Sequence, residues 1–167
     1  MAKILVSILM GSDSDWEVMK EAYDAMKEFG VASDMNVMSA HRTPHEVGEF
    51  VSRAVSDGKK VIIAGAGSAA HLAGVCAAHT TLPVIGVPLN ATSLGGFDAL
   101  LSTVQMPAGI PVATVAVGKS GARNAGILAV QILATADALL AQKLVEYKKT
   151  MAEKVKEKNS KMQKTLA

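Results

Sequence analysis

The sequence has little cysteine, few aromatic residues and no long apolar run. Cys76 is the one cysteine in 167 residues, which excludes an internal disulfide framework, suits a reducing compartment and makes the cytoplasm the simplest expected location. Aromatic residues make up only 4%, so the core must be built from Val, Ile, Leu, Ala and Met. The apolar start at 3–10 falls short of the ~18 residues that a membrane span needs. Gly11-Ser12-Asp13 follows it in place of a small-residue cleavage site, so neither a membrane segment nor a signal peptide is expected.

Charge is scarce as well, and it is unevenly distributed. Charged residues make up 19% of the chain and the net charge is +2, too small to indicate a nucleic-acid partner. Residues 1–136 carry 9 Lys and Arg against 11 acidic residues, whereas residues 137–167 carry 8 Lys against 4. The basic balance therefore belongs to the C-terminal segment and does not mark a patch on the body of the protein.

Apolar residues are plentiful, at 50% of the chain, which excludes a disordered protein. At ~100–200 residues per domain, the length predicts one domain over residues 1–167. Its core is expected at about 1–135 and a C-terminal helix at about 136–162. Short apolar runs predict strands at 3–10, 33–38, 60–64, 83–87 and 111–117, and helical patterns lie between them. This alternation is typical of a parallel sheet covered on both faces, so the predicted fold is a three-layer α/β sandwich of the flavodoxin or Rossmann type.

In such a fold, ligands bind at the C-terminal ends of the strands, where three segments are expected to meet: 11–15, 39–43 and 65–71. In the first, the hydroxyls and free amides at a helix start can bind phosphate, and Asp15 suits a ribose hydroxyl. Helix capping alone explains the same residues equally well. In the second, His41 can exchange a proton near neutral pH, and Arg42 offers a bidentate fork for phosphate. The alternative is a solvated loop that merely begins a helix. Thr43 is the predicted N-cap of that helix, Pro44 its first residue and Glu46 the partner of Thr43 in a capping box, and the helix is expected to end at Gly58.

The third segment is predicted to be a glycine loop at 65–67, followed by a small-residue helix from about 68 to 78. It matches the dinucleotide fingerprint in form, but the acidic residue expected ~20 positions later is missing. The glycines are therefore interpreted as allowing the backbone to lie close to a small ligand. His71 is expected to be a structural hydrogen-bond partner. Cys76 and His79 lack the second pair of ligands that a zinc site requires.

Five motifs occur in an order that resembles a known enzyme family: MGSDSDW at 10–16, SAHRTP at 39–44, AGAGSAAHLAG at 64–74, PVIGVP at 83–88 and VQMPAGIPVATVAVG at 104–118. The chain resembles the N5-carboxyaminoimidazole ribonucleotide mutases, the class I, bacterial-type enzymes of de novo purine synthesis, up to about Tyr147. Two residues depart from the commonest family pattern: Ser68 stands where it has Gly, and Ala73 where it often has Pro.

The resemblance implies an isomerase that moves a carboxylate from the exocyclic nitrogen to ring carbon C4 of an aminoimidazole ribonucleotide, without a cofactor or a metal. It implies that His41 carries the proton, and that the substrate is bound by Ser12, Asp15, Ser39, Arg42, Gly67 and Ser68. It also implies a homo-octamer. An apolar stripe of helical period after the last strand is expected to pack against a neighbouring subunit: Ala138, Leu139, Leu140, Leu144, Val145, Tyr147 and Met151.

Three alternatives stay open. An animal-type relative uses free CO2 to carboxylate aminoimidazole ribonucleotide, but it has Lys after the His of the SAH element, where this chain has Arg42. A nucleotide-binding oxidoreductase rests on the glycine pattern at 65–70 alone. A non-catalytic flavodoxin-like binding module leaves His41 without a role.

Overall fold

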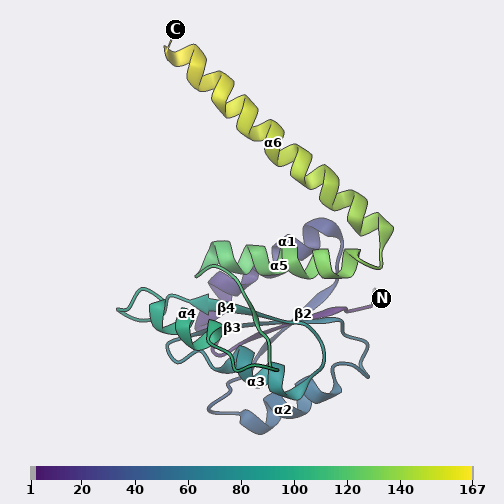
Figure 1. Ribbon diagram of the computed structural model, residues 1–167, viewed down its shortest axis with the longest axis vertical. Coiled ribbons are helices and arrows are strands. Elements are labelled where there is room, and N and C mark those ends of the chain that lie inside the picture. The colour runs from purple at the N-terminus through teal and green to yellow at the C-terminus, as the bar shows by residue number, and fades with distance from the viewer. Residues whose placement is uncertain (1–2, 167) are drawn as a thin grey trace.

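A parallel sheet of five strands forms the centre of the computed structural model, which describes residues 3–166 (Figure 1). The strands lie in the order β2-β1-β3-β4-β5. In this order the winding reverses between β1 and β3, the point at which doubly wound sheets bind ligands. The predicted three-layer α/β sandwich is confirmed, in its flavodoxin-like form. The strands are β1 (Val6–Met10), β2 (Ser33–Val37), β3 (Val61–Gly67), β4 (Val84–Leu89) and β5 (Ala113–Thr114).

Helices cover both faces of the sheet, and each face has its own apolar core (Figure 1). On one face, α1 and α5 pack against each other closely, because Gly126 of α5 lies directly against the backbone of α1 at Ala22. On the other face, the sheet meets α2 and α3, and α4 shares this face since Gly86 of β4 lies against Thr103 of α4. The helices are α1 (Trp16–Phe29), α2 (Pro44–Arg53), α3 (Leu72–His79), α4 (Phe97–Val104), α5 (Lys119–Ala134) and α6 (Ala138–Leu166), with a short 3-10 helix η1 (Asp13–Asp15) before α1.

The predicted start and end of α2 are partly wrong. Pro44 does occupy the first turn, but the Thr43 hydroxyl does not form a capping box: it donates to the Ser39 carbonyl, 3.1 Å away, and accepts from the Ser39 amide at 2.9 Å. The helix ends at Arg53 and turns lead on to Gly58, which leaves Val55 exposed. The Thr43 side chain therefore closes the loop that precedes the helix. Such a local hydrogen bond to the backbone competes with capping of the helix start.

The glycine segment and the last strand also differ from expectation. Gly65, Ala66 and Gly67 continue β3 and pair with β4, so they are strand and not loop. The following helix, α3, therefore begins only at Leu72. The last strand, expected at 111–117, is reduced to Ala113–Thr114 at the edge of the sheet.

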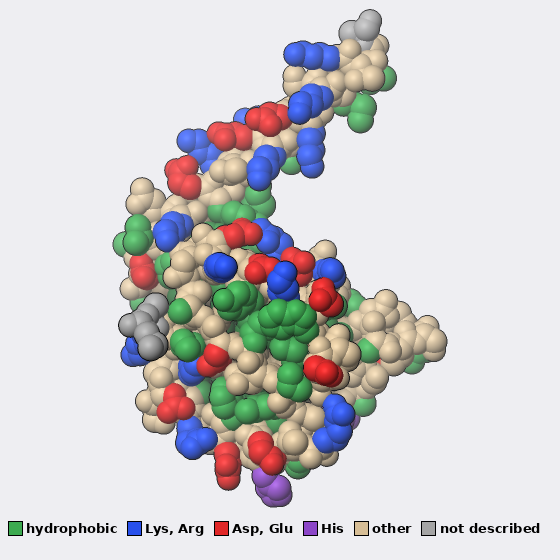
Figure 2. All heavy atoms as spheres, turned by 180° about the vertical axis from the view of Figure 1, so that it is seen from behind, with side chains coloured by type: hydrophobic (Ala, Val, Ile, Leu, Met, Phe, Trp, Pro, Cys, Tyr) green, Lys and Arg blue, Asp and Glu red, His purple; other side chains and the backbone are tan. Residues whose placement is uncertain are grey.

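The first turns of α6 pack on the body of the protein, and the rest of this 29-residue helix projects away from it (Figures 1 and 2). Leu140 is buried, the Tyr147 ring meets the Phe29 ring edge-on at 5.3 Å, and Lys143 Nζ donates to the Phe29 carbonyl at 2.7 Å. Together with the partly buried Leu144, these contacts correct the expectation that the whole stripe faces a neighbouring subunit. Of the helices between residues 3 and 166, α6 included, none combines the length and the apolarity needed to cross a membrane. That residues 1–167 form one domain stays a prediction.

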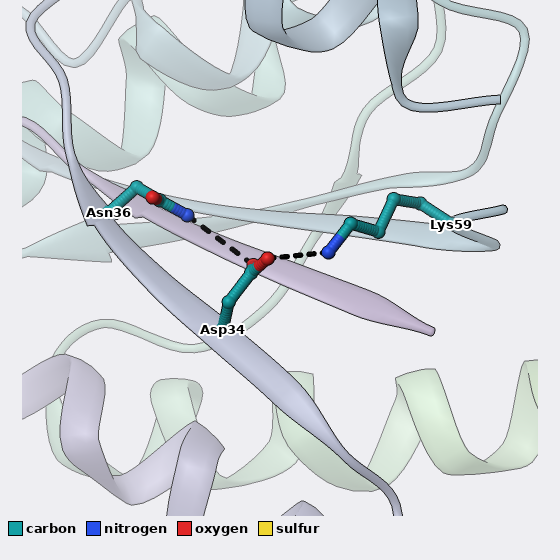
Figure 3. A network of polar contacts seen from close by, with 3 residues as sticks. All are labelled: Asp34, Asn36 and Lys59. Carbon is teal, nitrogen blue, oxygen red and sulfur yellow. Dashed lines mark hydrogen bonds and ion pairs between the residues drawn. The ribbon is translucent and has the colours of Figure 1, made fainter. Parts of the chain in front are cut away.

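An ion pair joins the amino-terminal half of β2 to the segment just before β3, at the opposite end of the sheet from the predicted ligand rim (Figure 3). Lys59 Nζ lies 2.5 Å from Asp34 Oδ2, and the side-chain amide of Asn36 donates to Asp34 Oδ1 at 3.3 Å. The Lys59 side chain is 10% exposed and the Asp34 side chain 29%. Because Lys59 is nearly buried, the carboxylate is what compensates the loss of its hydration.

We expect Lys59→Ala to lower the free energy of unfolding by about 1–3 kcal/mol. A fully buried pair loses ~3–5 kcal/mol when one partner is removed, and the partial exposure of Asp34 reduces this cost. Urea denaturation at fixed protein concentration measures it, with the exposed neighbour Lys60→Ala as the matched control. Equal effects of the two substitutions would show that the pair adds nothing beyond a surface lysine.

Candidate functional site

A cavity of about 360 Å³ opens at the carboxyl ends of β1, β2 and β3. The three segments that the sequence places on this rim, 11–15, 39–43 and 65–71, all contribute to its wall, and Ala91 after β4 adds to it. The predicted convergence is therefore confirmed. The lining residues are Gly11, Ser12, Ser14, Asp15, Ser39, Ala40, His41, Arg42, Ala66, Gly67, Ser68, Ala69, His71, Leu72 and Ala91.

The loop after β1 combines the capping and the binding interpretations. Ser12 is the N-cap of η1, and the Asp15 carboxylate accepts a hydrogen bond from the Ser12 amide at 3.1 Å, which completes a capping box. The hydroxyls of Ser12 and Ser14 lie 2.9 Å apart, and both residues still face the cavity. Burial raises the pKa of Asp15, against the lowering effects of the Ser12 amide and of Arg42. The capped helix start thus presents hydroxyls and a partly desolvated carboxyl group to a ligand.

The loop after β2 is joined to the loop after β1 by Arg42. Its guanidinium donates to the Gly11 carbonyl at 2.7 Å and to Ser39 Oγ at 3.4 Å, and its amide donates to the same hydroxyl at 3.2 Å. These contacts hold the guanidinium at the mouth of the cavity. A guanidinium has five N–H donors, so two side-chain contacts leave it able to bind an anion.

His41 and His71 face each other in the cavity. His41 Nε2 lies 2.8 Å from His71 Nδ1, and the two rings are nearly perpendicular, at 89°. A hydrogen bond between two ring nitrogens needs one donor and one acceptor, so the pair shares a single proton along this edge. His71 was expected to be structural. The structure places it in the cavity wall, in contact with His41, the proton carrier predicted from the sequence. Its position just beyond β3, beside the switch point of the sheet, is the signal that could have indicated this.

Close packing explains the two glycines at the end of β3. A Cβ at Gly65 would collide with the Met19 side chain of α1, and a Cβ at Gly67 would collide with Ala91. Since both glycines lie within the strand, they do not form the phosphate-binding turn of a dinucleotide site. The missing side chain of Gly67, which lines the cavity, lets Ala91 after β4 approach the end of β3.

Ser68, the next residue, adopts a left-handed backbone with φ of 56°. This conformation favours glycine and costs other residues ~1–2 kcal/mol. Ser68 is exposed in the cavity wall, at the position where the resemblance leads one to expect Gly. The loop between β3 and α3 is therefore strained, and other contacts must hold it.

Cys76 and His79 take no part in this cavity. Cys76 of α3 is fully buried in the core on the α2 and α3 face of the sheet, and burial raises the pKa of its thiol to about 12, so it is no nucleophile. The ring of His79 covers Gly48 of α2, in a separate cleft. Across residues 3–166, no three His, Cys, Asp or Glu side chains are grouped as a metal site requires.

Comparison with known proteins identifies relatives over most of the chain. A family model described as AIR carboxylase matches residues 5–154. The chain is 54% identical over 158 residues to the N5-carboxyaminoimidazole ribonucleotide mutase of Bacillus subtilis, covering 95% of this chain and 98% of that protein. It is 52% identical over 155 residues to the Brucella melitensis protein of the same name, covering 93% and 96%. The crystal structure of Treponema denticola PurE matches with a TM-score of 0.85 and 31% identity, covering 94% of this chain and 97% of that one.

The family match includes every loop that lines the cavity, from Gly11 to Ala91. The expected fold is present, the three motif-bearing segments meet where the sequence places them, and relatives above half identity extend over nearly the whole chain. This chain belongs to the AIR carboxylase family.

Proposed function

We propose that this protein is an N5-carboxyaminoimidazole ribonucleotide mutase of purine biosynthesis, the activity for which its relatives are named. The observation that carries the proposal is the position of His41. It lies in a small cavity whose wall also holds an arginine, a serine-rich helix start and a stretch of Gly and Ala. The cavity thus combines a proton carrier, groups that bind a phosphorylated ribose and an apolar wall.

The first half of the proposed reaction releases CO2. The substrate carries a carboxylate on its exocyclic nitrogen, and protonated His41 gives its proton to that nitrogen. The C–N bond then breaks, its electrons remain on nitrogen, and aminoimidazole ribonucleotide, CO2 and neutral His41 result. One general acid is sufficient for this step.

The second half returns the CO2 to carbon. The electron-rich C4 of the ring attacks the trapped CO2, and neutral His41 removes the C4 proton, which restores the aromatic ring. His41 is then protonated again, so the cycle closes without another acid or base. Retention of CO2 beside C4 supplies much of the rate, because the second step is effectively unimolecular.

The remaining cavity residues are assigned to the ribonucleotide. Arg42, Ser12 and Ser39 line one side and suit the phosphate, since a guanidinium and hydroxyls bind phosphate oxygens well. Asp15 is assigned to a ribose hydroxyl. Gly67 and Ser68, on the β3 side, form the small wall against which CO2 is retained.

Isotope labelling tests this function against the carboxylase alternative. The protein is given N5-carboxyaminoimidazole ribonucleotide in buffer containing 13C-bicarbonate, and the label in the carboxylate of the product is measured. A mutase converts this substrate directly, and most of its product is unlabelled. A carboxylase that takes free CO2 forms labelled product and also acts on aminoimidazole ribonucleotide with bicarbonate alone. Binding of NAD in place of the ribonucleotide would support the oxidoreductase, to which the strand position of Gly65 and Gly67 gives no support.

We also propose that the protein assembles as a homo-octamer in the cytoplasm, the compartment that its one reduced, buried cysteine suits. The projecting part of α6 supports assembly. At 3.6 residues per turn, its apolar side chains continue the face by which Leu140 and Leu144 pack on the body. Lysine and acidic side chains line much of this part of the helix (Figure 2). Within residues 151–166, the large apolar side chains that are exposed are Met151, Val155, Met162 and Leu166.

We expect His41→Asn to retain ribonucleotide binding and to reduce kcat by ~10⁴-fold or more. Loss of a general acid–base group costs ~10²–10⁴-fold, and His41 serves both halves of the reaction. Steady-state kinetics measure kcat, and His45→Asn, four residues away and outside the cavity lining, is the control. A variant that keeps a tenth of the wild-type rate would falsify the role of His41.

We expect Arg42→Lys to raise KM for the ribonucleotide by ~10-fold or more, with a smaller effect on kcat. Lysine keeps the charge but loses the bidentate fork that suits phosphate and also reaches Gly11. Saturation kinetics separate the two constants, and Arg53→Lys on α2 serves as the control. An unchanged KM contradicts a phosphate role for Arg42.

We expect truncation after Thr150 to yield smaller oligomers while the body stays folded. The shortened chain keeps the buried Leu140 and the contacts of Lys143 and Tyr147 with Phe29 of α1, and it loses only the projecting part of α6. Light scattering gives the mass, and thermal unfolding followed by circular dichroism checks the body. Retention of the full oligomeric mass would show that the projecting part of α6 is no assembly element.

A further inference from the structure

Helix α4 is connected by a hydrogen bond to the strained loop that carries His71. The Ser102 hydroxyl of α4 accepts a hydrogen bond from the Ala70 amide, 3.0 Å away and 32 residues earlier in the chain. The same hydroxyl donates to the Asp98 carbonyl of its own helix at 2.8 Å. One side chain therefore joins the loop between β3 and α3 to a rigid helix.

The loop depends on this contact for two reasons. Ala70 is only 1% exposed, so without Ser102 its amide would be a buried donor without a partner, which is costly. Ser68, two residues earlier, has the left-handed φ of 56°, and such a conformation persists only where its surroundings hold it. Loss of the contact would therefore allow the loop to relax.

A second contact from the same helix supports the facing wall of the cavity. Asp98, one turn before Ser102, accepts a hydrogen bond from the Thr92 hydroxyl at 2.8 Å. Thr92 directly follows Ala91, the residue that packs against Gly67. Helix α4 thus holds the loops on both sides of the β3 end of the cavity.

We propose that Ser102 is a positioning residue for the reaction: its hydroxyl fixes the Ser68–His71 loop so that His71 meets His41. This inference rests on the proposed function, in which His41 carries the proton. Ser102 is absent from the cavity lining among residues 3–166 and acts only through the loop. His71 Nδ1, placed 2.8 Å from His41 Nε2, fixes the orientation of the reacting imidazole.

Amide hydrogen exchange tests the contact between Ser102 and the Ala70 amide directly and needs no measurement of activity. In hydrogen exchange followed by mass spectrometry with residue-level fragmentation, the Ala70 amide of the wild-type protein is expected to be protected. Ser102→Ala should increase its exchange rate by ~10-fold or more. The control is Ser56→Ala. The Ser56 hydroxyl likewise donates to a nearby backbone carbonyl, that of Arg53 at 2.8 Å. Rapid exchange at Ala70 in the wild-type protein overturns the proposal, even if Ser102→Ala does not fold.

Kinetics test the consequence for the reaction. A small displacement of a catalytic group can cost ~10²-fold, so Ser102→Ala is expected to lower kcat by ~10- to 100-fold. KM should change by less than ~3-fold, because Arg42 and the β1 loop are untouched. Ser102→Thr, which keeps the hydroxyl, should restore kcat, and Ser56→Ala should leave it unchanged. A Ser102→Ala protein that is fully folded and has wild-type kcat overturns the proposal.

A double-mutant cycle shows whether Ser102 acts through His71. If it does, adding Ser102→Ala to His71→Asn lowers kcat by no more than ~2-fold. If the loss of kcat in the double variant equals the product of the two single losses, Ser102 has only a structural role, and the proposal is overturned. A failure of the proposed function can be distinguished from a failure of this inference. In the first case His41→Asn retains activity, while exchange of the Ala70 amide still reports on the Ser102 contact.

Discussion

The parallel pairing of β1 with both β2 and β3 is the constraint on which the rest of the structure depends. Met10, the last residue of β1, pairs with Val37 on one side and with Gly65 on the other. Three chain segments that are far apart in sequence therefore leave the sheet at nearly the same level. Because the winding reverses between β1 and β3, no crossover helix covers the gap, and the loops can enclose a cavity there. His41, the Arg42 guanidinium and the small-residue wall meet for this reason.

Much of this arrangement could be predicted from the sequence, because each apolar run is short and each helical stretch has a clear period. The second strand, predicted at 33–38, and the convergence of the three segments agree with the structure. The errors arose where tertiary contacts outweigh local preference. Gly65 and Gly67 look like a loop in sequence, but they are strand residues whose missing side chains make room for Met19 and Ala91. Thr43 looks like a helix cap, but its hydroxyl closes the preceding loop.

The pairing of His41 with His71 could not be predicted in the same way. The two residues are 30 positions apart, and their contact depends on where the loop after β3 ends and α3 begins. The sequence pattern set that boundary too early, and a histidine inside a helix of small residues is ordinarily structural. With α3 starting at Leu72, His71 becomes a loop residue on the ligand rim. An error of four residues at a helix start thus changed the interpretation of a side chain from structural to functional.

The loops of the cavity are held by hydrogen bonds that run between segments. The Arg42 guanidinium, in the second loop, donates to the Gly11 carbonyl of the first loop. The Ser102 hydroxyl of α4 accepts from the Ala70 amide of the third loop. Such contacts matter because the loops lie outside the sheet and Ser68 carries backbone strain, so the ladder of strand hydrogen bonds alone does not fix them. The proposed reaction passes one proton twice through the His41 imidazole, so it needs that imidazole in a fixed place during both steps. In this proposal, the precise position of His41 depends on Ser102, which supports it through the Ser68–His71 loop.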